Sequence, residues 1–208
     1  MNLKTIILAD GNFPTQAIPL GYLKNADRII CCDGSVKDLT EAGFIPEAIV
    51  GDMDSLDDDL AKRFADRIFR DGNQDTNDLT KAVAWCTGRG LNDIVILGAT
   101  GKREDHTIGN ISLLVEYVKS ARIIMVTDSG IFIPLLGGRE LSSLPGQQVS
   151  IFSIDPDLEI SSSGLRYQLR NTKLTNWWTA TLNEAVGNRF KLDFSNGRVI
   201  VFLKFTGE

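Results

Sequence analysis

The sequence contains few of the residues that build disulfide frameworks, zinc sites or membrane spans. Among 208 residues there are three cysteines and one histidine. Cys31 and Cys32 are adjacent in an apolar run and Cys86 lies in a helical pattern, so no CxxC or Cys/His spacing suits zinc or redox chemistry. No window approaches the roughly 18 apolar residues of a membrane span, and the N-terminal MNLKTIILADG turns polar too early for a signal peptide. We expect a cytoplasmic protein with three reduced packing cysteines.

The charge of the chain is slightly negative and spread along its length. Lys and Arg number 22 and Asp and Glu number 27, which gives a formal net charge of −5. Because the basic residues are scattered rather than clustered, the sequence lacks the electrostatic footprint of a nucleic acid or an anionic membrane surface. We expect no nucleic acid partner, no membrane partner, and a partner that is small or cationic.

The first 130 residues alternate short apolar runs with amphipathic stretches. The expected strands are Thr5–Ala9, Arg28–Cys32, Ala48–Val50, Ile68–Phe69, Asp93–Leu97 and Ile123–Val126. The expected helices lie near Thr15–Leu23, Val36–Ala42, Asp57–Ala65, Asp78–Thr87 and Thr107–Ser120. Continuous apolar strands separated by helices predict a mostly parallel, Rossmann-like sheet with helices on both faces, an α/β domain over residues 1–130.

From about Gly130 onward the helical period fades and a β pattern follows. The expected strands are Gln148–Ile154, Leu158–Ile160, Leu165–Leu169, Arg189–Phe194 and Arg198–Phe205. Asn196-Gly197 between the last two predicts a hairpin, because these residues readily take the positive φ angles of a tight turn. The pattern predicts a smaller antiparallel β-domain, a sandwich or half-barrel, over residues 131–208.

Acidic residues follow most strands of the predicted parallel sheet. The strand ends are followed by Asp10-Gly11, Asp33-Gly34, Gly51-Asp52, Asp71-Gly72, Gly98-Ala-Thr-Gly101 and Asp128. In an open parallel sheet these ends meet at one edge, where such folds bind ligands, so we expect the acids to line one crevice. Taken alone, Asp10 and Asp128 are ordinary turn residues.

The segment GDMDSLDDDL carries the densest group of acids. In an extended segment residues two apart point the same way, so we expect Asp52 and Asp54 to share a small volume. Like charges that close need a cation, and an all-oxygen cluster suits a hard ion such as Mg²⁺. The three acids Asp57–Asp59 are instead typical of the first turn of a helix, which we expect to be capped near Ser55.

Two further loops add acids and then bases. RDGNQDTNDLTKAV supplies Asp71, Asp75 and Asp78, and either Asp75 or Asn77 caps the helix that follows. One turn beyond Asp78, Lys81 either pairs with that acid or reaches an anion.

LGATGKREDHTIGN supplies Gly98 and Gly101 for close backbone approach, together with Lys102 and Arg103 as donors for phosphate. The loop lacks the residues of a Walker A motif, and its match to a dinucleotide fingerprint is weak. His106 serves orientation or packing more readily than catalysis.

Four segments taken together resemble thiamine pyrophosphokinase: GDMDS (51–55), QDTNDLTKA (74–82), GATGKREDH (98–106) and SSSGLRYQL (161–169). They occur in the family's order across nearly the whole chain, including the change from an α/β domain to a β-domain. The resemblance implies transfer of pyrophosphate from ATP to the hydroxyl of thiamine, giving thiamine diphosphate and AMP with Mg²⁺. It also implies a homodimer whose active site draws on both subunits.

The resemblance also implies residue roles. It assigns Mg²⁺ to Asp52, Asp54 and Asp78, the phosphate and alcohol region to Gln74 and Asp75, the transferring phosphates to Arg103, and the thiamine or metal region to Asp105. It assigns nucleotide contacts to Asp33, Gly34, Lys81, Gly98, Gly101 and Arg103, and thiamine contacts to Gln74, Asp105, Ser161 and Tyr167. Asp75 or Asp105 would accept the alcohol proton.

Two departures from the family pattern bear on these roles. Tyr167 stands where many relatives have tryptophan, and Asp33-Gly34-Ser35 stands where many read DGG or DGA. Trp177 and Trp178 are adjacent, so in an extended segment one would be buried and the other exposed or at a dimer contact.

Three other functions compete with this interpretation. A Mg²⁺-dependent phosphohydrolase would use the same acids to activate water on a phosphate ester. An oxidoreductase would bind a nicotinamide cofactor at GATGKRE but would leave the loop acids without a purpose. A non-catalytic regulator would bind nucleotide without turnover.

Overall fold

The structure, a computed structural model, describes residues 4–206. Residues 1–3 and 207–208, which form the outer ends of the two expected domains, lie outside the described residues. The chain divides into two compact units, one of Met1–Leu113 with Lys119–Asp128 and one of Leu114–Val118 with Ser129–Glu208. The boundary at 130/131 stays a prediction.

The first unit contains a six-stranded parallel sheet. Its strands are β1 (Thr5–Leu8), β2 (Arg28–Cys32), β3 (Ala48–Gly51), β4 (Ile68–Arg70), β5 (Asp93–Leu97) and β6 (Arg122–Val126). Within this unit the strand order is β6-β5-β1-β2-β3-β4, and every neighbouring pair is parallel. The expected parallel sheet is therefore confirmed, and the chain order reverses between β1 and β5.

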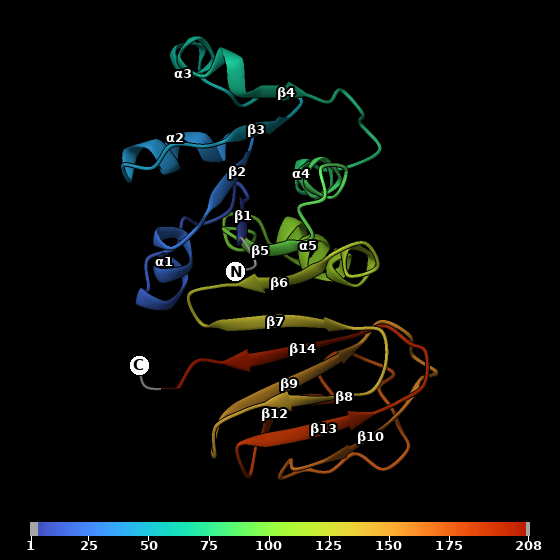
Figure 1. The fold of residues 1–208 in the computed structure, drawn as a ribbon. Coiled ribbons are helices and arrows are strands. Elements are labelled where there is room, and N and C mark those ends of the chain that lie inside the picture. Colours follow the sequence, from blue (N-terminus) through green and yellow to red (C-terminus); the bar gives the residue numbers. More distant parts are fainter. Residues whose placement is uncertain (1–3, 207–208) are drawn as a thin grey trace. The chain divides into compact units, whose positions relative to one another are not determined.

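Helices cover both faces of this sheet. They are α1 (Ala17–Lys24), α2 (Ser35–Glu41), α3 (Asp58–Arg63), the 3₁₀ turn η1 (Ala65–Arg67), α4 (Asp78–Thr87) and α5 (Glu104–Tyr117). Figure 1 shows α1 and α2 on one side of the parallel strands and α4 and α5 on the other. Crossover connections are right-handed, so reversing the direction of strand addition after β4 moves the later helices to the opposite face.

The middle of the sheet is the core of the first unit. Ile7, Ile30, Ile49 and Ile96 are fully buried, because helices exclude water from both faces of these apolar strands. The three free cysteines are buried as well. Burial raises the pKa of the Cys31 and Cys86 thiols to about 12 and raises that of Cys32 well above its ordinary value. All three are protonated packing residues, as expected.

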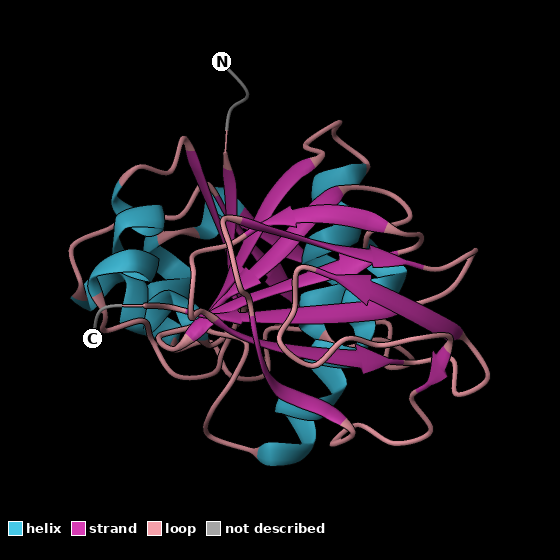
Figure 2. Ribbon diagram, turned by 90° about the horizontal axis from the view of Figure 1, so that it is seen from below, coloured by secondary structure: helices cyan, strands magenta, loops and turns pink. Residues whose placement is uncertain are grey.

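The second unit is an antiparallel β-sandwich. Its strands are β7 (Gly130–Leu135), β8 (Arg139–Ser142), β9 (Gln148–Ser153), β10 (Glu159–Ser163), β11 (Thr172–Lys173), β12 (Ala180–Glu184), β13 (Arg189–Asp193) and β14 (Val199–Lys204). Within this unit they form two sheets, β12-β9-β14-β7 and β11-β10-β13-β8. Leu135, Val149 and Val201 from the first sheet share one buried cluster with Ile160 and Phe190 from the second. Figure 2 shows the strands in magenta and the helices in cyan.

The hairpin predicted at Asn196-Gly197 is wrong. β13 pairs with β8 and β10, whereas β14 pairs with β7 and β9, so the two strands belong to different sheets. Neither turn residue has a positive φ. A Cβ at Gly197 would lie 2.5 Å from Cδ2 of Leu158, so this glycine serves close packing.

Two other local expectations are corrected. Residues Leu165–Leu169 form no strand; Leu165 makes a single bridge to Ala185. The cap of α3 is Asp57 rather than Ser55, because its Oδ1 accepts hydrogen bonds from the N–H groups of Asp59 and Leu60. The expectation that acids occupy the first turn holds for Asp58 and Asp59.

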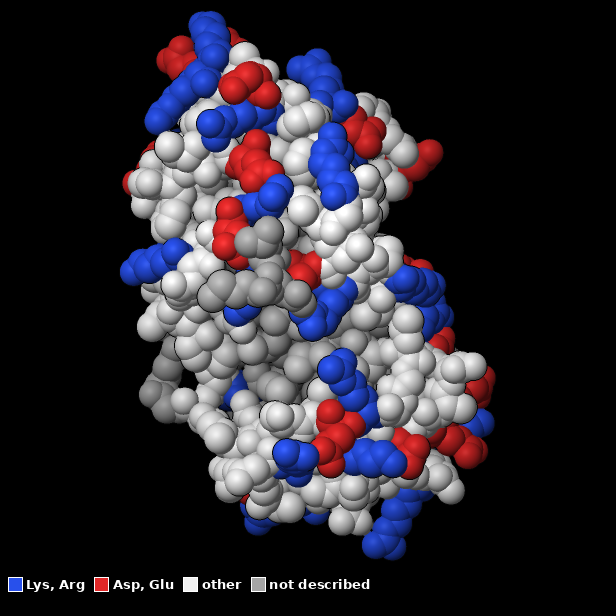
Figure 3. All heavy atoms as spheres, viewed as in Figure 1, with Lys and Arg blue, Asp and Glu red and all other residues white. Residues whose placement is uncertain are grey.

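The surface carries both signs of charge. On the face seen in Figure 3, Lys and Arg side chains are interspersed with Asp and Glu side chains. Within residues 4–206, no helix combines the length and the apolar character that a membrane span requires.

Candidate active site

A cavity of about 430 Å³ lies at the edge of the first unit where the parallel strands end. Loops after β1, β3, β4 and β5 line it, and this edge includes the point between β1 and β5 where the strand order reverses. Open α/β sheets bind ligands at this position. Among the expected site residues, the cavity is lined by Asp52, Gln74, Asp78, Lys81, Gly101 and Arg103.

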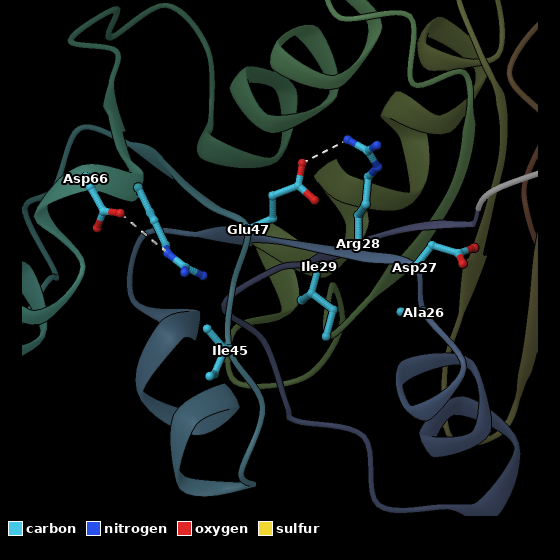
Figure 4. A pocket seen from close by; sticks show the side chains of 8 residues that line it. Ala26, Asp27, Arg28, Ile29, Ile45, Glu47 and Asp66 are labelled. Carbon is cyan, nitrogen blue, oxygen red and sulfur yellow. Dashed lines mark hydrogen bonds and ion pairs between the residues drawn. The ribbon is translucent and has the colours of Figure 1, made fainter.

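Another cavity, of about 610 Å³, lies where β2 and β3 begin (Figure 4). Several of its charged side chains have partners within the protein. Arg28 contacts Glu47 at 2.9 Å, and Arg67 donates a hydrogen bond of 2.6 Å to the carbonyl of Pro46. None of the expected site residues lines this cavity.

Three carboxylates converge at the edge where the strands end. Asp33 follows β2, Asp52 follows β3, and Asp78 is the first residue of α4. One carboxylate oxygen from each lies within 4.8 Å of those of the other two. The chain thus brings together oxygen ligands from three separate segments, the type of ligand set that Mg²⁺ prefers.

Asp33 is the member of this cluster that most needs a cation. Its side chain is buried, with 3% of the residue exposed. Oδ2 accepts a hydrogen bond of 3.0 Å from the N–H of Ser55, but Oδ1 is buried and has no hydrogen-bond partner. Burial raises the pKa of Asp33, as do the charges of Asp78, Asp52 and Asp54, while the Ser55 N–H opposes the rise. A buried carboxylate oxygen without a partner is costly, so the residues fit a bound metal ion.

Gly51 provides the space in which these acids meet. A Cβ at this position would lie 2.9 Å from Cβ of Asp33 and 3.2 Å from Cγ of Asp78. Gly34 plays a similar part beside Asp10, whose Oδ2 would lie 2.9 Å from an added Cβ. Side chains at either glycine would displace the carboxylates around the cavity.

Lys81 places a positive charge among the acids. Its side chain is 2% exposed, and Nζ lies 3.0 Å from Oδ1 of Asp78 and 3.7 Å from Oδ2 of Asp52. Burial acts to lower the pKa of Lys81, but the hydrogen bond and charge of Asp78 and the charge of Asp52 raise it overall. The N–H of Asp54 chiefly lowers the pKa of Asp52, with help from Gln74 and Lys81. Lys81 is therefore a charged ammonium at neutral pH.

The expectation that Asp52 and Asp54 lie in an extended segment, with their side chains pointing the same way, is wrong. Met53 has a φ of +70°, so the chain turns between Asp52 and Asp54 instead of running extended. Asp54 is exposed, its N–H donates to Oδ1 of Asp52 at 3.2 Å, and it is not part of the cluster of three carboxylates. Its role as a metal ligand stays a prediction. Sequence reasoning missed Asp33 as a ligand, although its position after β2 was the available signal.

The start of α4 is tied to its neighbours by amide side chains. Asn77 is the cap, since its Oδ1 accepts hydrogen bonds from the N–H and Oγ1 of Thr80 at 2.9 and 2.7 Å. Its Nδ2 donates to Oδ1 of Asn110 at 3.0 Å, and Asn110 donates to the carbonyl of Ala99 at 2.9 Å. Of the two candidates from sequence, Asn77 therefore caps α4, and the exposed Asp75 does not. Sequence reasoning also missed Asn110, which no pattern marked.

The glycines of the GATG loop serve packing between loops. Gly98 and Gly101 have φ angles of +64° and +79°, and a Cβ at Gly98 would lie 2.7 Å from the carbonyl oxygen of Ala9. The N–H of Gly11 donates to the carbonyl of Gly98 at 2.6 Å. The loop after β5 thus lies directly against the loop after β1.

Basic residues follow this loop. Lys102 Nζ lies 2.8 Å from Oδ1 of Asp10. Arg103 donates two hydrogen bonds to Asp105, at 3.1 and 2.5 Å, and both side chains are mostly exposed. Arg103 first and then the N–H of His106 lower the pKa of Asp105 to about 2. The bases are therefore paired with acids on the rim of the cavity.

Asp128 has a structural role, in line with its interpretation as a turn residue. Its carboxylate accepts hydrogen bonds from the N–H and Oγ1 of Thr15 and from the N–H of Gln16, at the start of α1. These bonds hold the first turn of that helix.

The expected thiamine residues of the β-domain lie in the second unit. Ser161 donates a hydrogen bond of 2.8 Å to Oδ1 of Asn171. The backbone of Tyr167 is fixed by Asn183, which accepts from its N–H at 3.1 Å and donates to its carbonyl at 2.7 Å. The residue is 64% exposed, so the side chain is available to a ligand.

The expectation that one of the adjacent tryptophans is buried is wrong. Trp178 is 74% exposed and Trp177 is 37% exposed. They lie in a turn rather than an extended strand, and Trp177 makes an edge contact with Phe152 at a centroid distance of 5.9 Å.

Comparison with known families finds two matches that together span most of the chain. Residues 20–126 match the family model described as "Thiamin pyrophosphokinase, catalytic domain". Residues 130–202 match "Thiamin pyrophosphokinase, substrate-binding domain".

Individual relatives agree with these matches. A thiamine pyrophosphokinase of Bacillus subtilis is 29% identical over 211 residues, covering 96% of this chain and 98% of that protein. Thiamine pyrophosphokinase 1 of Arabidopsis thaliana is 31% identical over 145 residues, covering 62% of this chain and 54% of that protein. The match therefore reaches only about half the length of the plant relative.

Solved structures share the fold. The crystal structure of thiamine pyrophosphokinase from Bacillus subtilis has a TM-score of 0.82 at 24% identity, covering 98% of this chain and 100% of that one. The yeast thiamin pyrophosphokinase has a TM-score of 0.80 at 18% identity, covering 98% of this chain and 87% of that one. With both halves of the sequence matched, the chain belongs to the thiamin pyrophosphokinase family.

Proposed function

We propose that this protein transfers the pyrophosphoryl group of ATP to the hydroxyl of thiamine, giving thiamine diphosphate and AMP in the presence of Mg²⁺. The observation that carries the proposal is the cluster of Asp33, Asp52 and Asp78, with its unpartnered buried oxygen, in a chain of this family. Hydride transfer to a nicotinamide cofactor does not by itself require such a cluster.

The three acids would hold the Mg²⁺ ion. When bound, the ion neutralises charge on the triphosphate oxygens, which acids alone would repel. Asp33, Asp52 and Asp78 are already held by different segments, so little reorganisation is needed to bind it. Asp54, expected from the family resemblance, remains a proposed further ligand.

Residues on the rim would position the substrates. Arg103 lines the cavity and would contact the transferring phosphates once it exchanges part of its pairing with Asp105. Gly34, Gly98 and Gly101 belong to loops that would bound the nucleotide. Gln74, Asp105, Ser161 and Tyr167 remain the proposed thiamine contacts.

The alcohol proton needs an acceptor. Asp75 and Asp105 are the candidates from sequence. The pKa of Asp105 is lowered to about 2 chiefly by Arg103, and the part of that pairing which Arg103 keeps makes Asp105 a poor base. We therefore favour Asp75, which is exposed on the loop before α4. A homodimer with a shared active site and a cytoplasmic location complete the proposal.

Product analysis tests this function. The protein is incubated with ATP, Mg²⁺ and thiamine, and the nucleotides are resolved. We expect AMP to form only when thiamine is present, and Asp78→Asn to lower the rate at least about a hundredfold. Asp59→Asn, an exposed acid in α3, is the matched control and should keep full activity. ADP or phosphate formed without thiamine would instead indicate a phosphohydrolase, and no turnover a regulator.

A further inference from the structure

Lys81 is unlike the other basic residues of the protein. Within residues 4–206 it is the one lysine or arginine that is buried. Burying an ammonium is costly unless acids surround it, so its position requires an explanation. The nucleotide contact that the family resemblance implies for Lys81 would place the ammonium against phosphate instead of protein acids.

The contacts of Lys81 point inward to the carboxylate cluster. Its Nζ lies 3.0 Å from Oδ1 of Asp78, one helical turn away, and 3.7 Å from Oδ2 of Asp52. Those two acids and Asp33 form the candidate metal site. The ammonium thus contacts two of the three carboxylates that would hold the ion.

We infer that Lys81 is a positioning residue that acts as a permanent counter-ion of this cluster, rather than a phosphate contact. This inference rests on the proposed function, because it takes the cluster to be the Mg²⁺ site. Three carboxylates and one ammonium leave two negative charges, which one divalent ion neutralises. Before the ion binds, the positive charge of Lys81 offsets the repulsion between the carboxylates of Asp52 and Asp78. The same charge lowers the affinity of the cluster for Mg²⁺.

The test compares the response to Mg²⁺ of Lys81→Met and wild-type protein without nucleotide. Methionine keeps most of the length of the side chain and removes the charge. We expect Lys81→Met to unfold at a lower temperature than wild type in EDTA, and Mg²⁺ to raise its Tm more than it raises that of wild type. Lys62→Met is the matched control, because Lys62 forms the same i,i+3 pair with Asp59 on the exposed surface. That variant should respond as wild type does.

Kinetics provide a second readout. A positioning role predicts that Lys81→Met lowers kcat at least about tenfold and changes the KM for ATP less than about threefold. A Mg²⁺ response no larger than that of wild type overturns the inference, as does a KM for ATP raised about tenfold with kcat unchanged.

A double variant keeps the test decisive if Lys81→Met unfolds. Adding Asp52→Asn removes one negative charge together with the positive one, so we expect the double variant to be more stable than Lys81→Met in EDTA. A double variant that is no more stable than the single one overturns the inference. Neither stability comparison needs turnover, so absence of AMP formation by wild type would count against the proposed function alone.

Discussion

At the scale of single residues, the most informative side chain is Asp33. Its carboxylate is buried beside two other acids, and one oxygen has no partner. Such a group destabilises the metal-free protein when it is ionised and becomes favourable once a cation is bound. Asp33 is therefore the residue at which stability and function oppose each other most directly.

The first prediction concerns Asp33→Asn and pH. Because the pKa of Asp33 is raised above its ordinary value, this carboxyl holds its proton more tightly in the folded protein than in the unfolded chain. The stability linked to this group is complete below its ordinary pKa of 3.8 and is lost as the pH rises through the higher folded value. In EDTA at pH 7 we expect Asp33→Asn to raise Tm by about 2–4 °C, the size of roughly 1 kcal/mol in a chain of this length.

Thermal unfolding at two pH values and with Mg²⁺ checks this prediction. The gain should disappear as the pH falls well below 3.8, where the carboxyl of wild-type Asp33 is protonated in both the folded and the unfolded states. At pH 7, Mg²⁺ should stabilise wild type more than Asp33→Asn. A variant less stable than wild type at pH 7 in EDTA would contradict the account of Asp33.

Site residues could be predicted where strand ends revealed them, and not where local geometry decided. Asp52 and Asp78 were expected at one edge, and the structure brings them together with Asp33. The turn at Met53, which moves Asp54 out of the cluster, depends on a positive φ that the sequence GDMDS does not signal. Asn110 acts through a contact to a distant helix cap, which a local pattern cannot reveal.

At the scale of elements, the start of α4 controls the site. Asn77 caps the helix, and its other side-chain atom bonds to Asn110 of α5. Asp78 and Lys81 lie in the first turn after this cap. The position of two site residues therefore depends on a cap that contacts both its own helix and a neighbouring one.

The second prediction separates these two roles of the cap. Asn77→Ala should lower the free energy of unfolding by about 1 kcal/mol and lower kcat about tenfold or more, because Asp78 loses its fixed position. Asp57→Ala removes the equivalent cap of α3 and should lower Tm without changing kcat. Thermal unfolding and steady-state kinetics measure both. Equal effects of the two variants on kcat would contradict a special role for the α4 cap.

Elements of the first unit could be predicted because each carries its own signal. Asp93–Leu97 and Asp78–Thr87 have the bounds expected from their apolar patterns. In the second unit, the turn signal at Asn196-Gly197 suggested that β13 and β14 pair as a hairpin, and they do not. β14 is buried along most of its length and pairs on both sides with β7 and β9, and those distant contacts outweigh the local turn signal.

At the scale of the whole molecule, the change from helical to β patterning predicted an α/β part and a β-sandwich, and this fold class is confirmed. The sequence did not predict β7, β8, β11 or β12. β8 is largely exposed, and β12 has a register shift between Ala180 and Asn183, so neither shows a clean alternation. Fold class follows from patterns summed over many residues, whereas single strands depend on their partners.

The third prediction concerns Tyr167 of the second unit and its effect on thiamine binding as opposed to ATP binding. If thiamine binds against Tyr167, then Tyr167→Ala should raise the KM for thiamine about fivefold, because the loss of an aromatic face over a cation costs on the order of 1 kcal/mol. The KM for ATP should stay the same. Val186→Ala, an exposed apolar residue of the same unit, is the control. An unchanged KM for thiamine would remove Tyr167 from the site.

The most direct measurement is the location of Mn²⁺ by anomalous diffraction, in crystals grown with a nonhydrolysable ATP analogue and thiamine. We expect an ion bound by carboxylate oxygens of Asp33, Asp52 and Asp78, each within about 2.5 Å, and bridged to phosphate oxygens. An ion bound by Asp54 without Asp33, or one bound away from this edge of the sheet, would contradict this expectation.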